Sequence, residues 1–146
     1  MRSVILAALL LSSPALAQGM PLNPAVTQET LSATTCLHGW THTVRPPVAY
    51  TNALKLRFLA QSGLPSEAAQ DTKLDHIIPL VLGGSPDDPR NLMLQPNAES
   101  KDKDRVEVCL ARSVCSGRIT LAQAQQAIWS NWRTSGRLCS GYRVIE

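Results

Sequence analysis

Apolar residues recur every three or four positions in three segments of the chain, which predicts three helices. The first runs near 51–62 and has Thr51 as its N-cap. The second runs at about 99–114 and is followed by a glycine that ends it. The third opens at Thr120, which forms a capping-box pattern with Gln123. The apolar positions of these helices are Leu54, Phe58 and Leu59; Val106, Leu110 and Val114; and Leu121, Ala124, Ile128 and Trp132.

A different pattern separates the first two helices. Residues 73–82 are apolar and β-branched enough for a strand, and Pro79 places this strand at an edge or at a bend. Residues 83–89 are dense in turn-forming glycine, proline and aspartate, and residues 91–94 suit a short second strand. We therefore expect a β-hairpin with a long loop, and an α+β fold overall.

The N-terminal third lacks such periodicity. Residues 1–17 combine a positive start, an apolar run and small residues before Ala17, which is typical of a secretory signal peptide cleaved after Ala17. An uncleaved anchor is the alternative. Residues 18–35 are polar and predict an extended or mobile arm, whereas residues 36–50 favour a loop or short strand over a helix. A single domain at 36–146 is thus expected to follow the arm.

Composition narrows the class of protein. With 146 residues, 44% of them hydrophobic and 17% charged, the chain suits one globular domain and excludes a disordered tail, a collagen-like fibre and a coiled coil. The formal net charge of +3 permits a polyanionic partner without requiring one. No later segment is long and apolar enough to span a bilayer, so no stable membrane association is expected after cleavage.

The four cysteines all lie beyond the signal peptide. An even number in an exported chain, whether periplasmic or secreted, predicts two disulfides, and three connectivities are open. A zinc site at Cys36, His38 and His42 is the rival interpretation. An oxidising compartment and the lack of a C-x-x-C pair favour disulfides.

Residues 75–107 carry the candidate chemistry. The informative string is Leu74-Asp75-His76-Ile77-Ile78-Pro79-Leu80, then Gly83-Gly84, then Asp88-Pro89-Arg90-Asn91-Leu92. This string resembles the His-Asn-His (HNH) endonuclease family. The resemblance implies a small ββα core at about 73–114 that is built around one metal ion, with flanking helices.

The resemblance extends to an exported bacterial subgroup of that family and then covers residues 36–132. The matching positions are Cys36, Gly39-Trp40-Thr41, Val44-Arg45-Pro46-Pro47, Tyr50-Thr51-Asn52, Leu54-Lys55, Lys103-Asp104-x-x-Glu107 and Val114-Cys115-Ser116-Gly117. The subgroup's cysteines match Cys36 and Cys115. The resemblance therefore implies a disulfide between these two and leaves Cys109 to pair with Cys139.

The resemblance also assigns roles to three residues. It makes His76 the general base, Asp75 a metal ligand, and Asn91 the residue that steadies the loop and orients His76. A histidine suits the first role because its usual pKa lies near neutral pH. Adjacent residues on a strand point to opposite faces, so Asp75 and His76 need a local bend to reach one site. A structural Asp–His hydrogen bond is the plainer alternative.

The family's last metal-ligand position falls on Ser100, which is a poor ligand. Asp104 and Glu107 share a helix face, and we expect these two carboxylates to complete the metal site. Oxygen ligands favour Mg²⁺ or Mn²⁺, whereas added histidines would favour Zn²⁺ or Ni²⁺. The alternative is that the charges in 99–107 form only a solvated helix face.

Basic side chains near this stretch are candidates for phosphate contacts. They are Arg45, Lys55, Lys101, Lys103 and Arg105. Together these features predict an exported, metal-dependent endonuclease acting on DNA, with RNA as a further candidate and with little sequence specificity. The alternative, motivated by Ser100, is a catalytically impaired HNH scaffold that binds nucleic acid or a partner protein. A disulfide-braced structural protein is a third possibility.

Overall fold

The predicted hairpin forms in the computed structural model, which describes residues 19–139. Strand β1 (Thr72–His76) pairs antiparallel with β2 (Leu92–Pro96), and Asp75 lies opposite Met93. Strand β1 ends six residues before the predicted end at 82, because Pro79 has no N–H for a strand ladder and the 3-10 turn η3 (Leu80–Leu82) follows it.

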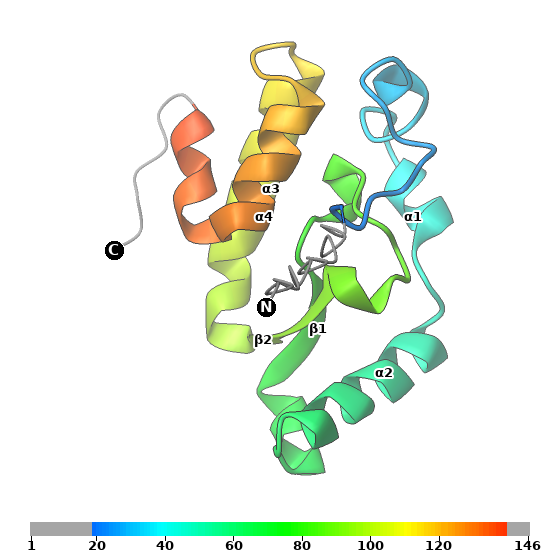
Figure 1. The fold of residues 1–146 in the computed structure, drawn as a ribbon, viewed down its shortest axis with the longest axis vertical. Helices are drawn as coiled ribbons and strands as arrows, with labels where there is room; N and C mark the ends of the chain where they lie inside the picture. The colour runs from blue at the N-terminus through cyan, green and yellow to red at the C-terminus, as the bar shows by residue number, and fades with distance from the viewer. Residues whose placement is uncertain (1–18, 140–146) are drawn as a thin grey trace, which may run out of the picture.

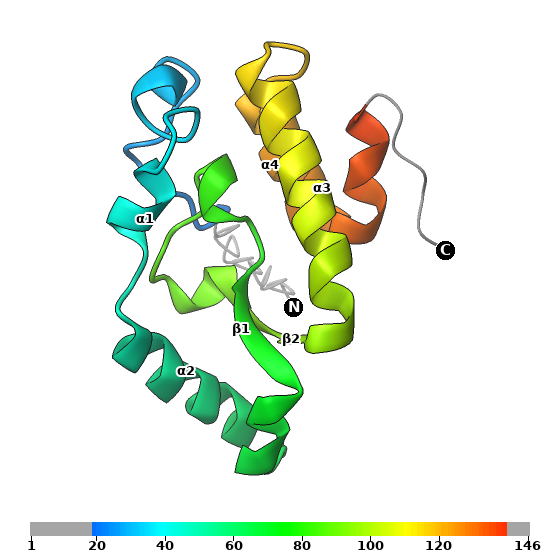
Figure 2. The ribbon, with the colours of Figure 1, turned by 180° about the vertical axis from the view of Figure 1, so that it is seen from behind.

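Three long helices form, as the apolar spacing predicts, and two of them flank this hairpin. They are α2 (Val48–Gln61), α3 (Asn97–Cys115) and α4 (Leu121–Ser135). The hairpin lies between α2 and α3, and α4 packs along α3 (Figures 1 and 2). The capping box at Thr120 is confirmed, but Thr51 is not an N-cap, because α2 begins three residues earlier, directly after Pro47. The remaining 3-10 turns are η1 (Leu31–Ala33), η2 (Ser66–Gln70), η4 (Pro89–Asn91) and η5 (Gly136–Leu138).

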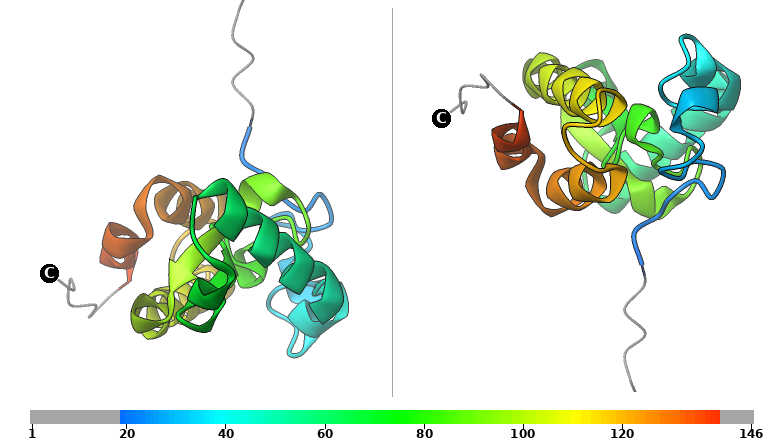
Figure 3. Two further views of the ribbon diagram at one scale, coloured as in Figure 1. Left: turned by 90° about the horizontal axis from the view of Figure 1, so that it is seen from below. Right: turned by 90° about the horizontal axis from the view of Figure 1, so that it is seen from above.

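The segment before α2 is more ordered than the sequence suggests. Residues 36–50 contain a short helix, α1 (Trp40–Val44), which begins at Gly39 with a φ of +84°. Residues 20–35 do not form a mobile arm. Val26 and Leu31 are buried in the core, and the segment lies beside α1 (Figure 3). Backbone hydrogen bonds from Asn23 to Gly83 and from Ser85 to Pro21 fasten it as well.

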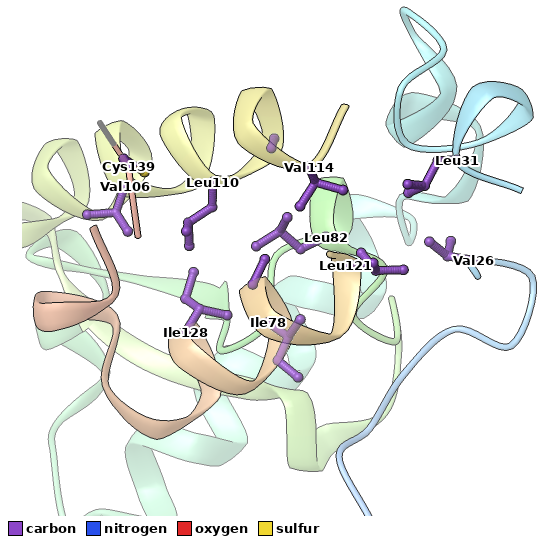
Figure 4. Packing of buried hydrophobic residues seen from close by; sticks show 12 residues of the cluster. Val26, Leu31, Ile78, Leu82, Val106, Leu110, Val114, Leu121, Ile128 and Cys139 are labelled. Atoms are coloured by element: carbon purple, nitrogen blue, oxygen red, sulfur yellow. The ribbon is translucent and has the colours of Figure 1, made fainter. Parts of the chain in front are cut away.

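The core lies between α3, α4 and the turn that follows β1. Leu110 of α3 and Ile128 of α4 pack with Ile78 and Leu82, and all four are almost completely buried (Figure 4). Each such side chain stabilises the fold by about 2 kcal/mol relative to an exposed one. Ile78 and Leu82 thus hold the turn after β1 against both helices.

Two disulfides brace this α+β fold. Cys36 pairs with Cys115 and Cys109 with Cys139, with Cα atoms 5.7 and 6.0 Å apart. The first closes a span of 79 residues, which stabilises the folded state by about 4 kcal/mol through the entropy of the unfolded chain. This disulfide also uses Cys36, which the alternative zinc site with His38 and His42 would need as a ligand.

Paired cysteines are compatible with the predicted export of the chain. The predicted signal peptide, residues 1–17, lies outside the described residues. Within residues 19–139, no helix has the length and apolar character that a membrane span requires.

Candidate functional site

A polar pocket of about 190 Å³ lies where the end of β1 meets α1, η3 and α3. Its charged and ionisable lining residues are Arg45, Lys73, Asp75, His76, Asp104 and Glu107. The structure thus gathers Asp75, His76 and the two helix carboxylates that the sequence singles out around one pocket. Asp75 and His76 both reach it because β1 ends at His76 and the chain bends immediately afterwards.

The ring of His76 is held by the long loop of the hairpin. Its Nε2 lies 2.9 Å from the carbonyl oxygen of Pro86. Since a carbonyl oxygen only accepts, Nε2 carries the proton, and Nδ1 is the acceptor of the neutral ring. Burial lowers the pKa of His76 below its usual 6.5, and the charges of Arg45 and Lys103 act in the same direction. The Pro86 hydrogen bond and Asp75 oppose this shift without reversing it. At neutral pH the ring is therefore a neutral base.

The side chain of Asn91 fastens that loop at Ile78 and Ser85, and its three hydrogen bonds all go to residues other than His76. Its Oδ1 accepts from the N–H of Ile78 at 2.9 Å, and its Nδ2 donates to the carbonyls of Ile78 and Ser85 at 2.9 and 2.8 Å. The side chain is fully buried, so these bonds replace water completely. Asn91 therefore fastens the loop at Ser85, and the next residue, Pro86, presents its carbonyl oxygen to His76.

Gly84 allows the loop to approach Ile78 and Asn91 closely. A Cβ atom at Gly84 would lie 1.8 Å from the carbonyl oxygen of Ile78 and 2.6 Å from Nδ2 of Asn91. Any larger residue would push the loop away from the strand end. The second glycine of the pair in the sequence is thus explained by close backbone approach rather than by an unusual φ.

Lys103 lies at the centre of the cluster and not on the surface. Its side chain is 0% exposed. Its Nζ donates to Oδ2 of Asp75 at 2.9 Å, to the carbonyl oxygen of His76 at 2.7 Å, and to Oε1 of Glu107. The prediction that Lys103 contacts a nucleic-acid phosphate is wrong, because its three N–H donors are all used inside the protein.

Burial and neighbouring charges shift the pKa values of Lys103 and Glu107. Burial acts to lower the pKa of Lys103, but the carboxylates of Glu107 and Asp75 outweigh it and raise that pKa above its usual 10.5. Burial raises the pKa of Glu107 above 4.5, against the opposing influence of Lys103. On the solvent side, Lys73 pairs with Asp104 at 3.3 Å and lies 3.8 Å from Asp75.

The predicted metal ligands do not fit a divalent ion in this arrangement. The ammonium of Lys103 already lies between Asp75 and Glu107, and Lys73 pairs with Asp104. A second cation between the first two carboxylates would lie against that ammonium and be repelled by it. In the part of the chain that the structure describes, no group of three or more His, Cys, Asp or Glu side chains is arranged to hold a metal ion.

The other predicted residues are dispersed. Arg45, at the end of α1, lines the pocket, whereas Lys55 donates to the carbonyl of Ala69 at 2.6 Å and so joins α2 to η2. Lys101 is exposed, and Arg105 pairs with Asp102 on the outer face of α3. The hydroxyl of Ser100 donates to the carbonyl of Asn97 in the first turn of its own helix, at 3.0 Å. Of the basic residues proposed to bind phosphate, only Arg45 lies at the pocket.

Sequence reasoning missed Lys73, the role of Lys103, and Pro86. Lys73 precedes Asp75 by two residues on a strand, a spacing that places both on one face. Lys103 precedes the core residue Leu110 by seven residues on α3, so helical periodicity could have predicted its burial. No sequence signal identifies Pro86, whose role depends on the path of the loop.

Comparisons with known proteins found no matching family model, no matching curated protein and no matching solved structure.

Replacing Asn91 by aspartate tests the pinned loop. A carboxylate has the same shape but cannot donate, so it would face two carbonyl oxygens inside the protein. We expect Asn91→Asp to lower the free energy of unfolding in urea by at least about 3 kcal/mol. Asn97→Asp is the matched control. It also loses one bond to a carbonyl, but it lies exposed at the start of α3 and should cost about 1 kcal/mol or less. Equal losses would contradict the assigned role.

The lowered pKa of His76 predicts a pH dependence of stability. Because the folded state favours the neutral ring, His76 contributes stability that is complete above about pH 6.5 and is lost as the pH falls through the folded pKa. Between about pH 7 and about pH 5, the wild type should therefore lose more stability than His76→Gln. Glutamine keeps a donor for Pro86 but does not titrate. Thermal unfolding of both proteins at the two pH values measures this, and an identical loss would contradict a lowered pKa.

Proposed function

We propose that this chain hydrolyses phosphodiester bonds of nucleic acids, as an exported endonuclease of the HNH type, with His76 as the general base. The observation that carries the proposal is the His76 ring. It is neutral, it lines a polar pocket, and its Nε2–H is fixed by the carbonyl of Pro86. The order of hairpin and helix around the pocket, β1, β2 and α3, is consistent with the ββα core that the sequence resemblance implies.

Hydrolysis needs a water molecule that loses a proton as it attacks phosphorus. Nδ1 of His76 is the acceptor available for that proton. Arg45 and Lys73 line the same pocket and supply positive charge for the phosphate oxygens. Contacts of this kind hold the backbone and carry no base information, so cleavage should show little sequence preference. No step is assigned to a metal ion, since Lys103 lies where the predicted ligands converge.

A second candidate is a nucleic-acid-binding module without catalytic activity. The cluster around Lys103 favours it, because three of the charged groups that could act on a substrate are paired with one another inside the protein. The pocket would then bind a phosphate of the backbone through Arg45 and Lys73 and leave it intact. The two candidates share a ligand and differ only in whether the phosphodiester bond breaks.

A plasmid-nicking assay with the oxidised chain separates the two. We expect the wild type to nick supercoiled DNA, and His76→Gln to do so at least about 100-fold more slowly, because it lacks the proton acceptor. The control is His42→Gln, an exposed histidine of α1.

Single-stranded RNA tested in parallel decides which substrate is preferred. Binding of DNA by the wild type without any cleavage would favour the binding module. Equal cleavage by wild type and His76→Gln would show that another group is the base.

A further inference from the structure

We propose that the ammonium of Lys103 is the built-in cation of this site. It takes the place between Asp75 and Glu107 where a divalent ion would bind, so the folded chain binds no such ion there. Removing the ammonium should convert the carboxylate pair into a divalent-cation site. This inference rests on the cluster alone and holds whether or not the chain cleaves nucleic acid.

The three oxygens around Nζ are the first part of the argument. They belong to a carboxylate of β1, the backbone carbonyl that follows it, and a carboxylate one turn further along α3. Carboxylate and carbonyl oxygens are the donors that Mg²⁺ and Mn²⁺ prefer. Here all three are directed at an ammonium group, whose three N–H bonds match them in number.

The burial of Lys103 is the second part. Its position on α3 precedes Val106 and Leu110 by three and seven residues, so its aliphatic stem lies on the helix face that packs against the core. A divalent ion could enter between Asp75 and Glu107 only if the whole side chain left this face. Expulsion would expose the stem and leave space in the core, and both changes cost stability.

The connection between elements is the third part. The ammonium bonds to Asp75 and to the backbone of His76, so it fastens the end of β1 to α3 at the residue whose ring enters the pocket. A metal ion bound to the same oxygens would hold the strand end to the helix in the same way. Lys103 is therefore a positioning residue that performs the structural part of a metal ion's role.

Titration of the oxidised wild-type chain with Mn²⁺ tests the first half of the proposal. Isothermal titration calorimetry, with free manganese followed by electron paramagnetic resonance, should show no saturable binding that depends on Asp75. A one-to-one site in the wild type that disappears in Asp75→Asn would overturn the proposal. This measurement needs only the native protein and one variant at a half-buried position.

The second half is tested with Lys103→Ala, which removes the ammonium that lies between Asp75 and Glu107. Its melting temperature in EDTA should lie below that of the wild type, and Mn²⁺ should raise it in a saturable manner. The wild type and Lys101→Ala, which alters an exposed lysine of the same helix, should show no such rise.

Two further outcomes are informative. If Lys103→Ala is unfolded in EDTA by circular dichroism, Mn²⁺ is expected to restore its helical signal, because the ion would replace the lost charge. No effect of Mn²⁺ on the folding or melting of Lys103→Ala would overturn this half. A rise that persists in the double variant Lys103→Ala/Asp75→Asn would overturn it as well.

Discussion

The end of β1 and the middle of α3 are joined through one buried ammonium group. Lys103 brings a positive charge into a position with no solvent contact, where an unpaired ion would be very unfavourable. Asp75, Glu107 and the His76 carbonyl compensate it from two different elements. The charge, its partners and their spacing thus fix how the hairpin sits on the helix. Loss of one of the two carboxylates would leave the buried ion only partly compensated.

A second constraint, the amide of Asn91, completes the site from the other side. It fixes the loop after β1, and that loop presents the Pro86 carbonyl to His76. His76 is therefore held at two points. Lys103 bonds to its backbone carbonyl, and the Pro86 carbonyl of the loop bonds to its ring. Neither contact uses Nδ1, so the acceptor nitrogen of the ring takes no part in its support. This separation is what a general base requires.

Much of the fold follows from sequence periodicity. The hairpin, α2, α3 and α4 arise from apolar spacing and from turn residues that act locally, and the capping box at Thr120 formed as its pattern indicates. Helix α1 escaped prediction because its start depends on one positive φ at Gly39. The burial of residues 20–35 depends on long-range contacts of Val26 and Leu31, which no local pattern reveals.

The site was only partly predictable for a related reason. The motif resemblance pointed to Asp75, His76 and Asn91, but the charge run of α3 looks the same whether a lysine points outward or inward. The inward position of Lys103 changes the chemistry most, since it brings an ammonium group to two carboxylates that were expected to hold a metal ion. A resemblance of short motifs can suggest which residues gather, whereas the partners of each charge depend on the packing of the whole helix.

A crystal structure of the oxidised chain, grown in the presence of Mn²⁺ and examined by anomalous scattering, tests the central claim most directly. The account predicts that Nζ of Lys103 lies within hydrogen-bond distance of Asp75 and Glu107, with no anomalous peak between these carboxylates. Manganese bound to Asp75, with the Lys103 side chain displaced from the cluster, would contradict it.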